Sequence, residues 1–284
     1  MAPRLRSQLP VSTCLGTPSV SWSAYRPRRA FSSRLHASPS STPGSARARA
    51  CTMSDAAPAT WRFSRPSWWV TTVKLWAPIG QPTLAIAAAR ASTCGLRNVS
   101  FQEGDSAELN FGSQFDALIG RAVLMFQRDP ETMLSRLVQR VRPRGVVAFH
   151  ETDWASARSF PTMLSWTRSC ELVVATLTAT GADPYMGMKL YSLFIGAGFP
   201  PPSLRYVSRI GGGREHVLMV TNLVVTVLPE AERLGLVTPG EIDPSTLQER
   251  VLADVTASGS VVIGWSEVGA WSTVPSQSLM LELA

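Results

Sequence analysis

The stretch DPETMLSRLVQRVRPRGVVAF, residues 129–149, decides the fold because a helix and a buried strand follow each other in it. Asp129 with Pro130 behind it is typical of a helix start, as N-cap and first helical residue. The segment RPRG, residues 142–145, ends that helix, and the short apolar run at 145–149 predicts a buried strand. Apolar residues recur between them at helical spacing and predict one buried face: Met133, Leu134, Leu137, Val138 and Val141.

The residues before this stretch continue the same alternation. PTLAIAAARASTCG, residues 82–95, opens with a proline and stops at a glycine, which predicts a short helix. NVSFQ, residues 98–102, predicts a strand, and FDALIGRAVLM, residues 115–125, begins as a buried strand that loosens after Gly120. Alternating strands and helices favour a mostly parallel α/β sheet with right-handed crossovers.

The residues after this stretch carry further helices and two more strands. The predicted strands cover residues 203–210, closed by a triple-glycine turn, and residues 260–271. The predicted helices cover residues 162–180, 189–197, 216–236 and 244–257. The last two helices form a helical insertion near 215–257 within one domain of residues 83–284.

The composition fits a soluble globular protein. The chain has 284 residues and 45% hydrophobic content, enough for a sizeable core. No apolar run reaches the roughly 18 residues that span a bilayer, so we expect no membrane insertion. The net charge of +7 comes from the first 100 residues, which hold 13 Lys and Arg and one acid, whereas the remainder is mildly acidic. Nucleic-acid binding is therefore not expected of the patterned part.

Cysteine and histidine are too scattered to predict a metal centre. The four cysteines are Cys14, Cys51, Cys94 and Cys170, with no CxxC pair, and the three histidines are His36, His150 and His216. A tetrahedral metal site needs such ligands in close groups. We therefore expect no metal and a reducing compartment, the cytoplasm.

Residues 1–82 differ in character from the rest of the chain. They are rich in Arg, Ser, Pro and Trp and show no apolar period of 2 or 3.6, which predicts an irregular or disordered segment. The first 54 residues hold eight arginines and no acid, so a transit peptide and an organellar location are the alternative.

The stretch NVSFQEGDSAELNF, residues 98–111, followed by residues 115–126 and 129–149, resembles the second half of class I S-adenosylmethionine-dependent methyltransferases. This resemblance implies a Rossmann-like sheet with helices on both faces and an antiparallel last strand. It also implies S-adenosylmethionine as cofactor and a small molecule as methyl acceptor. By the same resemblance, Gly104, Asp105 and Ser106 would contact the adenine, and Gly120 and Arg121 would line the methionine end of the cofactor.

Two neighbouring residues are candidates for a catalytic base. His150 and Glu151 follow the predicted strand at 145–149, and open α/β sheets bind ligands at the carboxyl ends of their strands. A solvated loop after the strand is the alternative for both. Trp154 is a candidate for the acceptor pocket, with simple packing as its alternative.

The glycine-rich GxGxG turn of the family, where the backbone approaches the cofactor, is absent before residue 82. A second reading frame can supply it. Read from the third base of the Met53 codon, with codon choices that residues 53–81 allow, this frame can encode VGCGAGDVAFLAAELVGDDGEVVGTDRSA. We therefore interpret residues from about 20 to 82 as a frameshifted translation. The activity of this chain would then be impaired, and a non-catalytic remnant is the alternative. Loss of the first two strands would leave the strand at 115–120 with an exposed edge.

Overall fold

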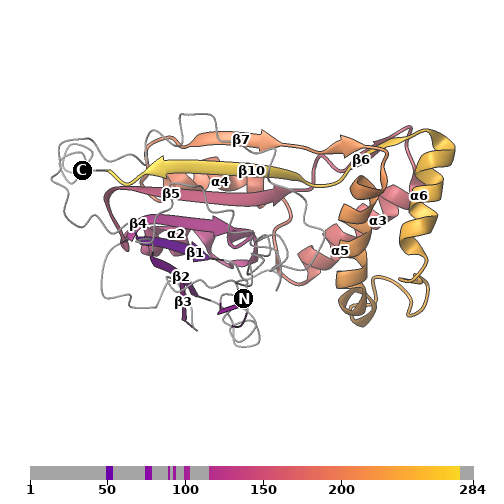
Figure 1. The fold of residues 1–284 in the computed structure, drawn as a ribbon, viewed down its shortest axis with the longest axis horizontal. Coiled ribbons are helices and arrows are strands. Elements are labelled where there is room, and N and C mark those ends of the chain that lie inside the picture. Colours follow the sequence, from indigo (N-terminus) through magenta and orange to yellow (C-terminus); the bar gives the residue numbers. More distant parts are fainter. Residues whose placement is uncertain are drawn as a thin grey trace, which may run out of the picture.

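The computed structural model describes residues 115–275 without interruption and, before them, residues 49–53, 74–78, 89, 92–93 and 99–102. A sheet with helices behind it lies on the left of Figure 1, and a smaller group of helices lies on the right. Ala89, Ser92 and Thr93 are helical and lie within the helix expected at residues 82–95.

The main sheet contains seven strands in the order β3-β2-β1-β4-β5-β10-β7. All strands run parallel except β10, which is antiparallel to both β5 and β7. The predicted mostly parallel α/β sheet with an antiparallel last strand is thereby confirmed. The strands are β1 (Arg49–Met53), β2 (Lys74–Pro78), β3 (Val99–Gln102), β4 (Phe115–Arg121), β5 (Val141–Asp153), β7 (Ser203–Val207) and β10 (Ser266–Thr273).

Strand β1 occupies the centre of this sheet. It pairs in parallel with β4, with Ala50 opposite Ala117 and Met53 opposite Gly120, and it pairs with β2 on its other side. The expectation of an exposed edge on β4 is therefore wrong. Backbone groups alone form these ladders, so a strand can fill the position without the apolar pattern that identifies strands in sequence.

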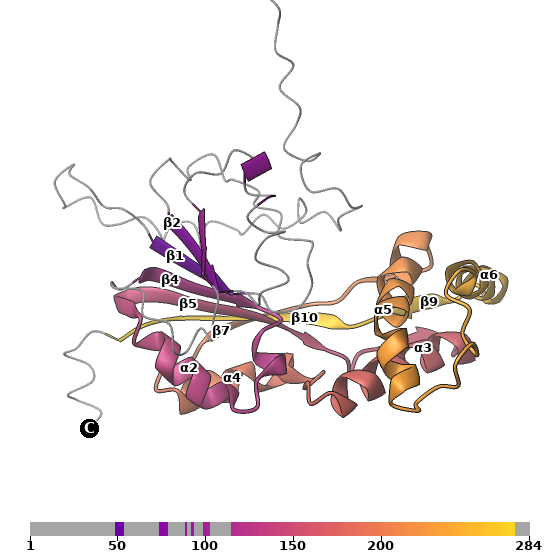
Figure 2. The same ribbon diagram turned by 90° about the horizontal axis from the view of Figure 1, so that it is seen from below.

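Two helices cover one face of the sheet, as Figure 2 shows: α2 (Pro130–Val138) and α4 (Met186–Gly196). The predicted N-cap of α2 is confirmed, since the Asp129 carboxylate accepts a hydrogen bond of 3.0 Å from the Thr132 amide. Apolar residues of β4, β5 and β10 meet those of the two helices in one core. Its fully buried members include Phe115, Leu118, Leu134, Leu137, Val147, Phe149, Leu190, Phe194, Val268 and Ala270.

The remaining elements form a cap beyond the carboxyl ends of β4 and β5 (Figure 1). A three-stranded sheet in the order β6-β9-β8 packs there with three helices that share a second core. That core includes Trp154, Trp166, Val173, Val220, Val224, Val251 and Val262. The elements are β6 (Arg158–Phe160), α3 (Leu164–Ala179), β8 (Ile210–Gly211), α5 (Arg214–Arg233), α6 (Leu247–Ser258) and β9 (Val261–Ile263).

Two stretches predicted as single strands are each shared between the cap and the main sheet. Residues 260–271 divide into β9 and β10, with Gly264 and Trp265 between them. Val262 is buried in the cap core, whereas Val268 is buried under the main sheet. Residues 203–210 divide in the same way into β7 and the start of β8. The apolar run at residues 260–271 thus contributes to two cores in succession.

Within the described residues, no helix is both long enough and apolar enough to cross a membrane. The same residues contain no group of three or more His, Cys, Asp or Glu side chains that could hold a metal ion. Cys170 is buried in the cap, and burial raises the pKa of its thiol to about 12, so it acts as an apolar packing residue.

The close approach of α4 to the sheet depends on Gly187. A Cβ at this position would lie 2.7 Å from Val268 Cγ2 and 3.0 Å from the Thr152 carbonyl oxygen. We expect Gly187→Ala to lower the free energy of unfolding by about 1–3 kcal/mol, since α4 must move away from its contacts. Urea denaturation followed by circular dichroism measures this change.

Gly196→Ala on the same helix is the matched control. The three atoms nearest to a Cβ there belong to the carboxylate of Glu131, which ends a flexible side chain. Alanine also has the higher helix propensity, so the variant should be as stable as the parent or slightly more stable. Equal losses in both variants would contradict the proposed role of Gly187.

Candidate active site

The sheet reverses its strand order between β1 and β4, and ligands of open α/β sheets bind at the carboxyl edge of such a point. At this edge β4 leaves the sheet through Ala122, which has a φ of 49° in the left-handed region. The Ala122 amide donates a hydrogen bond of 2.9 Å to the His150 carbonyl oxygen. A non-glycine residue with this backbone conformation is uncommon, and such strain concentrates at functional sites.

Glu151 holds the loop that follows Ala122. Its carboxylate accepts hydrogen bonds from the amides of Val123, Leu124 and Met125 at 3.0, 3.0 and 3.4 Å. The side chain is fully buried, and burial raises its pKa to about 7, outweighing the three amides that favour the charged form. Glu151 therefore contacts the loop backbone and fixes the start of the short helix η3 (Leu124–Phe126).

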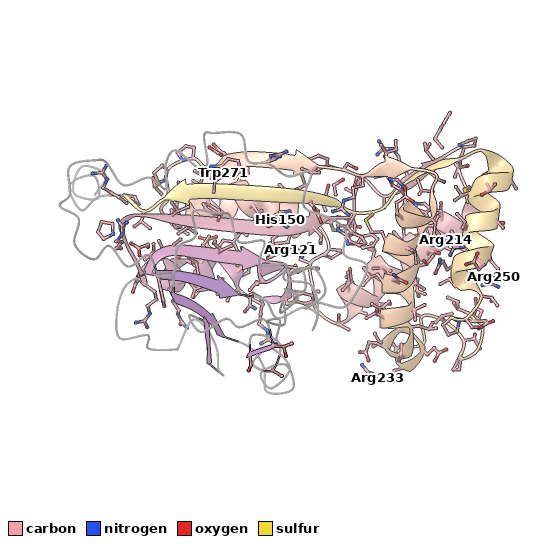
Figure 3. All side chains as sticks on the ribbon, viewed as in Figure 1. Arg121, His150, Arg214, Arg233, Arg250 and Trp271 are labelled. Carbon is pink, nitrogen blue, oxygen red and sulfur yellow. The ribbon has the colours of Figure 1, made fainter. Side chains whose placement is uncertain are left out.

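His150 lies on the opposite face of β5 from Glu151, because successive side chains of a strand alternate. It pairs with Arg121 of β4 and with Gly269 of β10 (Figure 3). Its Nε2 lies 3.7 Å from an oxygen of Glu267. Burial lowers the pKa of His150 to about 4 although Glu267 opposes the shift, so the imidazole is neutral at pH 7 and can accept a proton.

Glu267 is the centre of a charged cluster that sequence reasoning missed. Its carboxylate lies 3.5 Å from Nη2 of Arg121 and 3.9 Å from Nη2 of Arg209, in addition to His150. The Glu267 side chain is 11% exposed. The available signal was an acid inside the otherwise apolar run SVVIGWSEVGAW, where charged residues are rarely buried without partners.

Gly120 and Trp154 both lie in packed surroundings. A Cβ on Gly120 would come within 2.2 Å of the Phe149 ring, so the glycine leaves room for that ring in the sheet core. Trp154 is 4% exposed, and its ring lies 5.2 Å from that of Trp265 in the cap core. The predicted adenine contacts Gly104, Asp105 and Ser106 lie outside the described residues.

The sequence after β1 lacks the glycine-rich turn of the family. β1 ends at Met53, which pairs with Gly120 near the carboxyl end of β4. In the sequence, Met53 is followed by SDAAP, which contains no glycine. β2 ends at Pro78, which carries no acid for the ribose hydroxyls.

Comparison with known proteins agrees with this fold. Residues 78–149 match the family model described as a methyltransferase domain. The similarity to a methyltransferase domain therefore covers these residues. The matched segment begins at the end of β2 and finishes within β5. No curated protein sequence matches the chain.

Several solved structures are similar to the whole domain. They include phosphoethanolamine N-methyltransferase 2 of Haemonchus contortus, with 13% identity over 82% of this chain and 50% of that one and a TM-score of 0.49. The YcgJ protein of Bacillus subtilis has 11% identity over 81% and 93% of the two chains, with a TM-score of 0.49. The [4+2]-cyclase SpnF has 16% identity over 80% and 75%, with a TM-score of 0.46.

The pKa shifts of His150 and Glu151 give opposite pH dependences of stability. The pKa of Glu151 rises from 4.5 to about 7, so the folded chain binds more protons there and stability falls as the pH rises through this window. The pKa of His150 falls from 6.5 to about 4, so the unfolded chain binds more protons and stability rises with pH between these values. Between pH 4.5 and 6.5 the two effects oppose each other.

We expect single substitutions to separate these effects. In Glu151→Gln only the pH dependence due to His150 remains. The free energy of unfolding of this variant should therefore increase more steeply from pH 4.5 to 6.5 than that of the parent. His150→Gln leaves the contribution of Glu151, so its free energy of unfolding should decrease over the same range. Urea denaturation at half-unit pH steps measures both slopes. Slopes that change in the same direction in the two variants would refute the assignment.

Proposed function

We propose that this chain derives from an enzyme that methylates a small molecule with S-adenosylmethionine. The observation that carries the proposal is the strand order, with its reversal beside β4 and the antiparallel β10, combined with the methyltransferase-domain match at residues 78–149. Cofactor-dependent methyl transfer requires the protein mainly to bind and orient its two reactants.

His150 is the residue that we assign as general base. It stands at the carboxyl edge of β5, and its pKa of about 4 keeps the ring neutral at pH 7. A neutral imidazole can take the proton of an acceptor hydroxyl or amine. Glu267, 3.7 Å from Nε2, is placed to stabilise the protonated ring. Glu151, the other candidate, serves in this proposal as the positioning residue of the loop at Val123–Met125.

We further propose that the chain as written is impaired, because its first loop lacks the glycines that the cofactor needs. The ends of β1 and β2 support the frameshift interpretation. In the alternative peptide that replaces residues 53–81, the sequence VGCGAG begins at the position of Met53, where β1 ends. The segment VVGTD of that peptide spans the positions of β2, so its acid falls at Pro78. The agreement of both positions with the ends of β1 and β2 supports the proposal.

Replacement of residues 53–81 by VGCGAGDVAFLAAELVGDDGEVVGTDRSA tests this proposal without changing the length of the chain. We expect calorimetric titration to detect S-adenosylmethionine binding by the replaced chain and not by the chain as written. The control is the same peptide with alanine at its three loop glycines, which should fold but lose binding, because added Cβ atoms occupy the path of the ligand.

Each outcome of this titration decides one point. Equal binding by the chain as written would show that it is not impaired and would exclude the non-catalytic remnant, which is the second candidate function. A folded replaced chain that does not bind would refute the frameshift. Resequencing of the gene gives an independent test, since the frameshift requires an insertion or deletion before the codon of Met53 and a compensating one near codon 82.

A further inference from the structure

We propose that a second copy of this chain packs against an apolar surface at the β7 edge of the main sheet. This surface, the α4–β7 patch, contains five partly exposed apolar side chains: Met188, Tyr191, Ile195, Leu204 and Tyr206. It lies on the face of the sheet that α4 covers, opposite to the face that carries His150. The contact between copies is therefore separate from the proposed function.

The underside of β7 is the first part of the patch. β7 is the last strand of the main sheet, at its upper edge in Figure 1. Leu204 pairs with Ala270 and Tyr206 with Val268, and paired residues point to the same face. Val268 and Ala270 are buried beneath the helices, whereas Leu204 and Tyr206 are 49% and 50% exposed. Among the described residues, the helix layer thus covers β10 and leaves the underside of β7 half open.

The outer side of α4 is the second part of the patch. A Cβ on Gly187 would meet β10, and a Cβ on Gly196 would meet α2. The two glycines lie about 180° apart around the helix axis, so they mark the sides of α4 that face β10 and α2. Tyr191 and Ile195 lie about 40° and 80° from Gly187, and Met188 about 100°. This apolar stripe is therefore on the side of α4 toward β10 and β7, turned to the solvent.

The two parts of the patch complement each other between copies. An edge strand with an apolar underside can be covered by a helix with an apolar side. The α4 of the same copy packs on β5 and β10, but the α4 of a second copy can lie under β7. In a two-fold arrangement each copy offers its α4 stripe to β7 of the other, so the same contact forms twice and closes the dimer.

The chemistry of the patch favours a copy of itself as the partner. None of its five side chains is charged, so two identical patches do not repel each other. An acidic peptide or a nucleic acid would find no positive charge there to pair with. Helices that lie on membranes carry several Lys and Arg residues beside the apolar face. α4 carries only Lys189, which forms an ion pair with Asp183.

The size of the patch matches one side of a dimer interface. Its five side chains are 42–63% exposed. Because each has about 200 Å² of surface in total, the patch offers about 500 Å². A standard interface buries about 800 Å² on each partner, of which about 60% is apolar. The α4–β7 patch therefore supplies about the apolar area that a stable dimer needs.

Sedimentation velocity of the full chain at about 1–100 μM tests the proposal. We expect the parent to form a dimer whose share rises with concentration, with a micromolar dissociation constant. Tyr191→Glu should raise that constant at least about tenfold, because the symmetric contact would bury two carboxylates without partners. Tyr206→Lys should have the same effect from the β7 side.

Tyr185→Glu is the matched control. Tyr185 is 41% exposed, against 46% for Tyr191, and it is the N-cap of the same helix. It lies about 20° from Gly196 around the helix axis, on the side of α4 away from β7. This variant introduces the same charge and should dimerise like the parent. Far-UV circular dichroism establishes that each variant is folded, and Tyr191→Ser and Tyr206→Ser replace a charged variant that is not.

A mixture of the two charged variants tests the two-fold geometry. A heterodimer of Tyr191→Glu and Tyr206→Lys places a glutamate opposite a lysine in one of its contacts and keeps the parent side chains in the other. We expect the mixture to dimerise about tenfold more tightly than either variant alone, since opposite charges at an interface select the partner.

Four results would overturn the proposal. A parent that stays monomeric at about 100 μM has no second copy on the patch, and binding of that monomer to phosphatidylcholine vesicles would assign the patch to a membrane. Equal effects of Tyr185→Glu and Tyr191→Glu would place the interface elsewhere. A series of growing oligomers would contradict a closed two-fold contact. A mixture no tighter than its separate variants would show that α4 of one copy does not meet β7 of the other.

Discussion

The direction of β10 is the constraint on which the site depends. The chain enters β10 from the cap, so the strand must run against β5 and β7, and its first residues lie at the carboxyl edge of its parallel neighbours. Glu267 is its second residue. The second residue of a parallel strand would instead lie at the opposite, amino edge of the sheet. The antiparallel insertion thus brings an acid from the end of the chain to Arg121 and His150 near its middle.

The apolar pattern of the sequence predicts which residues form helices and strands, but it does not predict which of the two hydrophobic cores each of them joins. Helix α2 and strand β4 agree with the sequence because each buries one face in one core. Residues 260–271 form a single apolar run, yet Val262 belongs to the cap and Val268 to the main sheet. Glu267 lies just after the point where the chain passes from the cap core to the main sheet. Its spatial neighbours therefore could not be inferred from the sequence. Partners far apart in sequence leave no local signal, whereas a cap such as Asp129 depends on three adjacent residues.

Strands β1 and β2 illustrate that strand pairing in a sheet depends less on side chains than a ligand site does. Strands β1 and β2 pair through backbone groups, which every residue except proline provides in full, so RACTM and KLWAP can take central positions. A cofactor loop depends instead on the absence of Cβ atoms at particular positions. The sheet order therefore does not depend on a glycine-rich sequence after β1.

Successive side chains of β5 point to opposite faces of the sheet, so its last residues have separate roles. Glu151 points toward the core and the loop after β4, where three amides surround its carboxylate. His150 points to the other face and meets Glu267 there. Burial favours the neutral form of both groups, which raises the pKa of the acid and lowers that of the base. One strand end thus supplies a group that fixes the backbone and a group that can accept a proton, and the separation follows from the two-residue period of the strand.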